Sequence, residues 1–232
     1  MTYSLRQFVS KVLPRSVQNT IVDLRDPIVA FAYHRKPQIP PPHAIKARAV
    51  INQARGHNVR VLVETGTYLG EMARKCSRHF EQILTIELSE KLAAEAARRL
   101  ERRRNVRVLC GESSRLLPQI LAVIREPVVF WLDAHYSGGA TAKGATECPL
   151  ERELHIIAEH ARQDHIILID DVRLMGSGEY PSLERVCELA RRINPRYQIE
   201  IRDDILRCEP PGDGIAGASA GMTPTYRPSL QD

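Results

Sequence analysis

Hydrophobic and polar positions alternate along the middle of the chain as a series of short apolar runs and longer amphipathic stretches. The apolar runs are rich in β-branched residues and lie at 59–64, 82–87, 106–110, 128–133 and 165–170. Helix-like stretches lie at 68–79, 89–103, 113–124, 149–163 and 181–193. Near-continuous β-branched runs that alternate with helices are typical of a parallel sheet buried on both faces. The pattern therefore predicts a doubly wound, Rossmann-like α/β fold.

The last two apolar runs differ from the others. They lie at 197–202 and 205–208, and only Asp203 and Asp204 separate them. Two residues can close an antiparallel hairpin, whereas a parallel crossover needs a dozen residues or more. We therefore predict a mostly parallel, seven-stranded sheet whose last strand is antiparallel.

The two ends of the chain differ from the middle in their hydrophobic pattern and composition. Residues 1–57 show short helical patterns that are interrupted by prolines, and we expect a helical N-terminal extension with breaks at Pro14, Pro27 and Pro37. The run 40–42 should be extended, and a helix is expected over 43–56. The extension could cap an acceptor site, mediate formation of a homodimer or touch a membrane surface. Residues 58–208 form the predicted core domain, and the Gly- and Pro-rich segment 209–232 reads as a flexible tail.

Composition limits the class of protein and its partners. Hydrophobic residues make up 43% of the 232 residues and charged residues 26%, which is ordinary for a soluble globular protein. The net charge of +5 permits an anionic partner without showing one. The basic run 98–104 contains no interleaved aromatic residue, so it lacks a stacking platform for bases, and a solvated helix end is the simpler interpretation. No nucleic-acid partner is expected.

The cysteines and apolar runs bear on the compartment. The five cysteines are widely spaced and contain no C-x-x-C pair, which favours reduced thiols in a cytoplasmic protein and argues against a zinc site. No apolar run is long enough to span a membrane, and the first residues lack the apolar core of a secretory signal.

Polar residues stand where each predicted parallel strand ends. The first strand runs into Glu64-Thr65-Gly66-Thr67-Tyr68-Leu69-Gly70, and two glycines at such a turn let the backbone approach a ligand closely. Glu87, at the end of the second strand, could accept both hydroxyls of a ribose. The remaining ends carry Gly111-Glu112-Ser113, Asp133 and Asp170-Asp171. Because ligands of open α/β sheets bind beyond the carboxyl ends of the strands, this edge is the predicted site.

The turn after the first strand has the pattern E-x-G-x-x-x-G, with an acid before the first glycine, instead of the G-x-G-x-x-G of dinucleotide-binding folds. At this point the chain resembles the class I S-adenosylmethionine-dependent methyltransferases, over roughly residues 59–208 and including the antiparallel last strand. The resemblance implies that residues at the first four strand ends bind S-adenosylmethionine. They are Glu64, Thr65, Gly66, Thr67, Tyr68, Gly70, Glu87, Leu88, Gly111, Glu112, Ser113 and Asp133.

A narrower resemblance rests on Asp133 together with Asp170 and Asp171. This set is similar to the acids that chelate Mg²⁺ in metal-dependent small-molecule O-methyltransferases. Carboxylate oxygens suit a hard divalent cation, which can bind two vicinal oxygens of an acceptor and lower the pKa of the hydroxyl to be methylated. Asp170 and Asp171 could alternatively cap a turn, or Arg173 could neutralise them.

A general base should remove the hydroxyl proton. His135 is the leading candidate, with a metal ligand or a loop histidine bonded to backbone as alternatives. The catechol-type enzymes have a lysine three residues after the acid that corresponds to Asp133, whereas this chain has Tyr136; Lys143 is a substitute candidate. The Gly-rich loop 134–148 is expected to act as a lid, with Ser137, Thr141 and Lys143 as acceptor contacts.

These observations favour an S-adenosylmethionine-dependent methyltransferase that methylates a hydroxyl oxygen of a small molecule, such as a sugar or a natural product, with help from a divalent metal. One alternative is a nicotinamide-nucleotide-binding oxidoreductase, which the missing third glycine disfavours. Another is a non-catalytic methyltransferase-like binding module. A nucleic-acid methyltransferase would carry an Asn/Asp-Pro-Pro-Tyr/Phe signature after the fourth strand, but the segment reads LDAHYSG.

Overall fold

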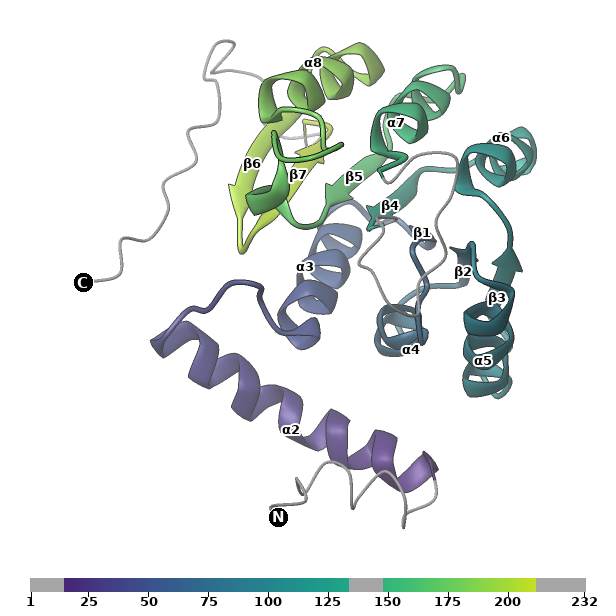
Figure 1. The fold of residues 1–232 in the computed structure, drawn as a ribbon, viewed down its shortest axis with the longest axis vertical. Coiled ribbons are helices and arrows are strands. Elements are labelled where there is room, and N and C mark those ends of the chain that lie inside the picture. The colour runs from purple at the N-terminus through teal and green to yellow at the C-terminus, as the bar shows by residue number, and fades with distance from the viewer. Residues whose placement is uncertain (1–14, 134–147, 212–232) are drawn as a thin grey trace.

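The computed structural model describes residues 15–133 and 148–211, with side chains from residue 25 onward (Figure 1). Its centre is one seven-stranded sheet in the order β3-β2-β1-β4-β5-β7-β6. The strands are β1 (Val61–Thr65), β2 (Gln82–Glu87), β3 (Val106–Cys110), β4 (Val128–Leu132), β5 (Ile166–Ile169), β6 (Gln198–Arg202) and β7 (Ile205–Glu209). The first five are parallel, and β7 is antiparallel to both β5 and β6, which confirms the predicted fold class.

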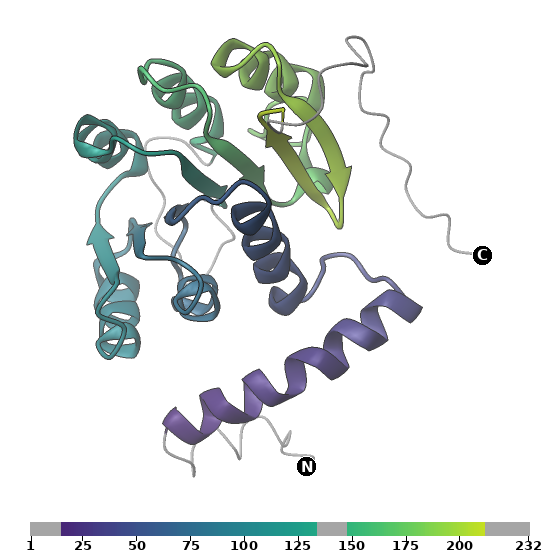
Figure 2. The same ribbon diagram turned by 180° about the vertical axis from the view of Figure 1, so that it is seen from behind.

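Helices cover both faces of the sheet (Figures 1 and 2). On one face lie α3 (His43–Gly56), α4 (Glu71–Cys76) and α5 (Glu90–Leu100), and on the other α6 (Ser113–Val123), α7 (Leu150–Ala158) and α8 (Leu183–Ile193). Successive residues of a strand point to opposite faces of the sheet. Leu62 packs into the hydrophobic cluster with α3 and α4, and Val63 packs into the cluster with α6 and α7. Burial on both faces explains why the central strands read as near-continuous apolar runs.

The order of the strands creates the crevice at which ligands bind in this architecture. From β1 the chain moves outward to β2 and β3, and then crosses back to β4 on the other side of β1. Helices that start on opposite sides of the β1–β4 boundary leave a crevice at the carboxyl ends of these strands. The backbone N–H of Asp133 donates to the carbonyl of Thr65 over 3.2 Å, which holds the two strand ends together.

The N-terminal part differs from the expectation at one proline. Helix α2 (Arg15–Arg35) runs through Pro27, so the predicted break at that residue is wrong. An interior proline removes one backbone hydrogen bond and clashes with the carbonyl four residues earlier, which usually kinks or breaks a helix, but α2 continues through Pro27. The predicted helix over 43–56 is confirmed as α3.

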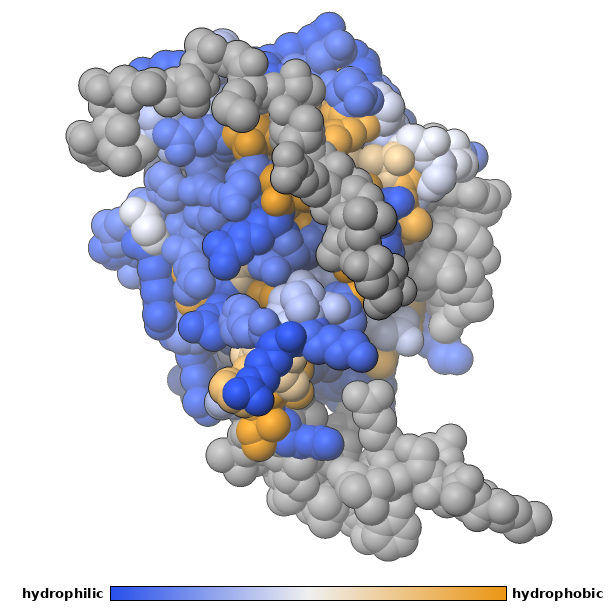
Figure 3. Space-filling model, turned by 90° about the vertical axis from the view of Figure 1, so that its left-hand side faces the viewer, coloured by the Kyte–Doolittle hydropathy of each residue, from blue (hydrophilic) through white to orange (hydrophobic). Residues whose placement is uncertain are grey.

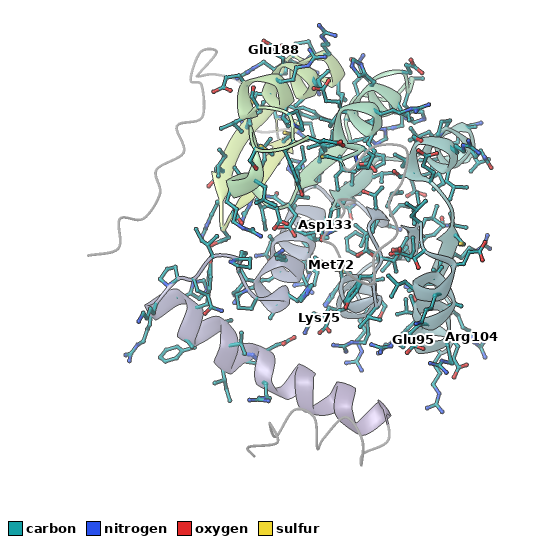
Figure 4. The ribbon with its side chains drawn as sticks, in the orientation of Figure 1. Met72, Lys75, Glu95, Arg104, Asp133 and Glu188 are labelled. Carbon is teal, nitrogen blue, oxygen red and sulfur yellow. The ribbon has the colours of Figure 1, made fainter. Side chains whose placement is uncertain are left out.

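Two polar contacts tie α2 to the rest of the molecule. Lys75, labelled in Figure 4, reaches from α4 to pair with Asp26, and Tyr33 Oη donates to Asp203 Oδ1 over 3.2 Å. The outer side of α2 exposes Ile28 and Phe31. Figure 3 shows that the surrounding surface is largely hydrophilic, with smaller hydrophobic areas. Among the residues described, no helix is both long and apolar enough to cross a bilayer.

Several of the predicted helices are shorter than the sequence pattern suggested. The helix expected over 68–79 starts at Glu71 because the preceding residues form a turn, and the helix expected over 149–163 ends at Ala158. A short 3₁₀ helix, η1 (Val172–Leu174), follows β5. All five cysteines are unpaired in the structure.

Candidate active site

The turn between β1 and α4 folds back over the end of β2. The backbone N–H groups of Gly66 and Thr67 both donate to the carbonyl of Ile86, over 3.0 and 3.1 Å. Gly66 and Gly70 have φ values of 85° and 75°, which side chains rarely adopt. A Cβ on Gly70 would also lie 2.7 Å from Leu100 Cδ1. These two positions therefore require glycine, and they bring the backbone to the edge where α4 begins.

Glu87 is held at the same edge by two backbone donors. Its Oε2 accepts from the N–H of Tyr68 over 2.7 Å, and its Oε1 accepts from the N–H of Ser89 over 2.9 Å. A carboxylate has about four acceptor positions, so both oxygens retain capacity for a ligand. The structure thus links the predicted ribose-binding acid directly to the Gly-rich turn.

Glu64 lies beneath this turn, where it is 1% exposed. Its Oε2 accepts from Thr85 Oγ1 over 2.7 Å, and Thr85 in turn hydrogen-bonds to Thr67. Burial raises the pKa of Glu64 to about 8, although the Thr85 hydrogen bond opposes the shift. In the free protein Glu64 therefore supports the turn from inside, and contact with a cofactor stays a prediction.

The third strand end joins the same edge. The N–H of Gly111 donates to the carbonyl of Glu87 over 2.9 Å, and Glu112 forms the N-cap position of α6. Ser113 begins α6 and is buried, while Leu88 is half-buried beside Glu87. The predicted cofactor residues thus lie on adjoining turns, and their roles remain predictions.

The structure brings together the three predicted metal ligands. Asp133, Asp170 and Asp171 each offer a carboxylate oxygen, and these oxygens all lie within 4.8 Å of one another. Asp133 lies near the middle of the molecule in Figure 4. Asp171 has a φ of 59°, in the left-handed region, which turns the chain directly after β5. The N–H of Asp171 donates to Asp170 Oδ1 over 2.9 Å.

Two basic side chains contact this acidic cluster. Lys46, from α3, hydrogen-bonds to Asp170 Oδ2, and its Nζ lies 3.6 Å from Asp171 Oδ1. Arg173 Nη1 donates to Asp171 Oδ1 over 2.6 Å and also pairs with Asp204. Arg173 therefore does contact the Asp pair, as one alternative reading of the sequence proposed.

The cluster holds more carboxylates than cations, and the pKa values reflect this. Burial and the Asp133 carboxylate hold the pKa of Asp170 well above its usual range, even though Lys46 opposes the shift. Burial alone would lower the pKa of Lys46, but the attraction to Asp170 outweighs it and the net shift is upward. The neutral form of Asp170 and the charged form of Lys46 are therefore both favoured relative to the free side chains.

A small cavity that opens to solvent lies beyond the ends of β4 and β5. Glu153 of α7 lines it together with acidic, aromatic and apolar residues, namely Leu132, Asp133, Cys148, Leu150, Ile169, Asp170 and Tyr180. Glu153 is 1% exposed, and its Oε2 accepts from Thr65 Oγ1 over 3.4 Å. The cavity therefore joins the acidic cluster to the end of β1.

Sequence reasoning missed Lys46 and Glu153, although each leaves a signal. Both occupy the buried side of an amphipathic helix: Glu153 lies among Leu150, Leu154 and Ile157 of α7. Lys46 lies among the buried residues of α3. A charged residue at an apolar position of a helix is unusual and points to a partner or a function.

Several predicted site residues lie in the segment 134–147, outside the described residues. They include both candidate bases, His135 and Lys143, as well as Ser137, Thr141 and most of the loop expected to form a lid. Their roles stay predictions.

Comparison with known proteins shows the fold. The chain matches no protein-family model, and no curated protein sequence matches it. It is similar in structure to an O-methyltransferase from Bacillus cereus in complex with S-adenosylhomocysteine, with 20% identity, a TM-score of 0.53, and 88% of this chain and 96% of that chain covered. It is also similar to the O-methyltransferase TomG from Streptomyces achromogenes in complex with S-adenosylmethionine (16% identity, TM-score 0.51, 91% and 100% covered).

A third similar structure is the S-adenosylhomocysteine-bound methyltransferase PaMTH1 from Podospora anserina, with 14% identity, a TM-score of 0.51, and 86% of this chain and 98% of that chain covered. At these identities the comparison establishes architecture. The chain has the Rossmann-like fold of class I S-adenosylmethionine-dependent methyltransferases, and the O-methyltransferase structures share nearly its whole length.

Proposed function

We propose that the protein is an S-adenosylmethionine-dependent methyltransferase that methylates a hydroxyl oxygen of a small molecule, such as a sugar or another vicinal diol, with the help of a divalent cation. The observation that carries the proposal is the convergence of Glu87, the Gly66–Gly70 turn and the acidic cluster at one edge of a methyltransferase fold. The proteins with similar structures that are named as O-methyltransferases support transfer to oxygen.

Glu87 and the turn after β1 suit a cofactor in which a nucleoside is joined to an amino acid, as in S-adenosylmethionine. Glu87 is fixed by two backbone donors and keeps acceptor capacity for ribose hydroxyls. The turn after β1 presents backbone to a ligand, because Gly66 and Gly70 leave no side chain in the way. The cofactor would supply the methyl group on a positively charged sulfur.

The donor set also suits Mg²⁺ or a similar ion. Asp133, Asp170 and Asp171 provide hard oxygen ligands within 4.8 Å of one another, as a divalent cation of this type requires. When bound, the ion would act as a Lewis acid that lowers the pKa of an acceptor hydroxyl. The protein residues orient the acceptor in the cavity, and much of the rate would come from this positioning.

The strand arrangement speaks against the nicotinamide alternative. A dinucleotide-binding sheet of the six-stranded type has the order 3-2-1-4-5-6, whereas a seventh strand, β7, is inserted here between β5 and β6 in the antiparallel direction. The turn after β1 also lacks the third close glycine that packs helix against strand in that motif.

Calorimetric titration with S-adenosylmethionine, S-adenosylhomocysteine and NADH tests the cofactor assignment. We expect binding of both sulfur ligands and none of NADH. Loss of binding in Glu87→Ala, with Glu90→Ala at the start of α5 as the control, would locate the ribose site. Absence of binding at millimolar S-adenosylmethionine would contradict the proposed function.

Titration with Mn²⁺ tests the metal assignment independently. We expect Asp170→Asn to abolish Mn²⁺ binding while S-adenosylhomocysteine binding persists. Asp164→Asn is the matched control, because Asp164 pairs with Arg162 away from the cluster. Equal Mn²⁺ affinity in the wild type and in Asp170→Asn would remove the metal from the proposal and leave the methyltransferase.

A further inference from the structure

Glu153 is a buried acid that the proposed function has not yet used. It faces inward from α7 and is 1% exposed, although a carboxyl group is among the most costly groups to bury. The hydroxyls of Thr65 and Ser113 hydrogen-bond to it. Its other oxygen, Oε1, is buried and has no hydrogen-bond partner among the residues that the structure describes.

The position of this carboxyl group is informative. Thr65, which binds one side of it, directly precedes Gly66 and the turn proposed for the cofactor. The small cavity on its other side is lined by Asp133 and Asp170 and opens to solvent, so an acceptor could approach from that side. Glu153 therefore lies between the two places that a methyl transfer must connect. An unpaired buried acceptor oxygen is destabilising, and a donor group on a ligand would satisfy it.

We propose that Glu153 is the general base that takes the proton from the acceptor hydroxyl. This inference rests on the proposed function. In the step, the acceptor oxygen forms a bond to the methyl carbon while the carbon–sulfur bond breaks and its electron pair stays on sulfur. The hydroxyl proton passes to Glu153 Oε1. The products are the methyl ether, neutral S-adenosylhomocysteine and a protonated Glu153, which then returns its proton to solvent.

The other carboxyls near the cavity are less suited to this role. Asp170 Oδ2 is engaged by Lys46, and Asp133 belongs to the cluster that would hold the cation. The charged and titratable groups around Glu153 are Asp133 from β4, Asp170 from β5, and Tyr180 and Cys148 from the flanking loops. In this setting burial raises the pKa of Glu153 to about 7, against the effect of the Ser113 and Thr65 hydrogen bonds. A base with a pKa near the working pH is the most effective.

The experiment compares two cofactor analogues, so it needs no knowledge of the acceptor. Sinefungin carries an amine where the methyl-bearing sulfonium stands in the cofactor, and S-adenosylhomocysteine carries a neutral sulfur. A carboxylate next to the reacting methyl should favour the charged amine. We expect the wild type at pH 8 to bind sinefungin about tenfold more tightly than S-adenosylhomocysteine. This preference should fall at least threefold in Glu153→Gln and survive in part in Glu153→Asp.

Glu151→Gln is the matched control, because Glu151 lies on the same helix but is only partly buried and pairs with Arg185. It should keep the wild-type preference. The inference is overturned if Glu153→Gln keeps that preference, or if only Asp133→Asn removes it. Failure of the wild type to bind either analogue overturns the proposed function itself and the inference with it.

A measurement on the wild type covers the case in which Glu153→Gln does not fold. At pH 7 a base next to the amine should lose part of its proton when sinefungin binds, and it should keep the proton when S-adenosylhomocysteine binds. Calorimetry in two buffers with different ionisation enthalpies counts the released protons. Equal proton release for the two ligands contradicts the inference.

Discussion

The ammonium of Lys46 hydrogen-bonds to Asp170 Oδ2 in the interior, where the Lys46 side chain is 10% exposed and that of Asp170 is 1% exposed. This pair joins α3, from the N-terminal extension, to the end of β5, from the predicted core domain. The extension therefore contributes a side chain to the candidate active site, in addition to covering one face of the sheet.

Replacement of Lys46 by methionine should destabilise the protein strongly. Removal of one partner from a buried ion pair leaves an uncompensated charge, so we expect a loss of about 3 kcal/mol in the free energy of unfolding. Millimolar Mg²⁺ should restore part of it, because the cation can replace the ammonium beside Asp170. Urea unfolding with and without Mg²⁺ measures both effects.

The control is Lys75→Met, which breaks the pair with Asp26. The Asp26 side chain is 32% exposed and can be solvated, so the loss should be smaller and Mg²⁺ should have no effect. An equal response of the two variants to Mg²⁺ would argue against a cation site at Asp170.

Gly70→Ala should destabilise the fold through the turn after β1. The φ of 75° disfavours alanine, and its Cβ would lie 2.7 Å from Leu100 Cδ1, which is buried and has little room to move. We expect a loss of about 2 kcal/mol. Gly56→Ala is the control: nothing lies within 4 Å of its Cβ, so alanine at the end of α3 should leave stability unchanged or raise it slightly. Urea unfolding of both variants checks the difference.

Much of the fold could be predicted from the sequence because its main signals are local. Burial on both faces makes a strand such as 128–132 apolar throughout. Only Asp203 and Asp204 lie between β6 and β7, and a connection of two residues permits only a hairpin. Pro27 was misread because an interior proline usually kinks or breaks a helix, whereas α2 continues through it. The length of α2 is not evident from its weak apolar pattern.

The candidate site also contains some residues that could be predicted from the sequence and others that could not. Asp133, Asp170 and Asp171 follow parallel strands, whose carboxyl ends meet at one edge, so their proximity could be inferred from order along the chain. Lys46 and Glu153 reach the site from helices. Which residue of a helix meets the sheet depends on how the helix packs against it, and this is a tertiary property that spacing along the sequence does not give.

Glu87→Gln should weaken the binding of S-adenosylhomocysteine without loss of the fold. The carboxylate accepts from the N–H groups of Tyr68 and Ser89 with different oxygens, and glutamine can satisfy only one of them. The mispaired amide would disturb the turn and one ribose contact together. We expect affinity to fall by about tenfold or more. Calorimetry measures it, and an unchanged dissociation constant would exclude Glu87 from the site.

Glu64→Gln should flatten the dependence of stability on pH. The pKa of Glu64 is raised by burial from 4.5 to about 8, so the folded state binds this proton more tightly than the unfolded chain does. The resulting stabilisation is fully present below the unfolded pKa and is lost as the pH rises toward 8. Its size is on the order of 1.4 kcal/mol for each unit by which the pKa is raised. Glutamine stays neutral, so the variant should be more stable than the wild type at pH 9 and similar at pH 5. Urea unfolding across this range tests the expectation, and parallel pH profiles of the two proteins would show that Glu64 is ionised in the fold at neutral pH.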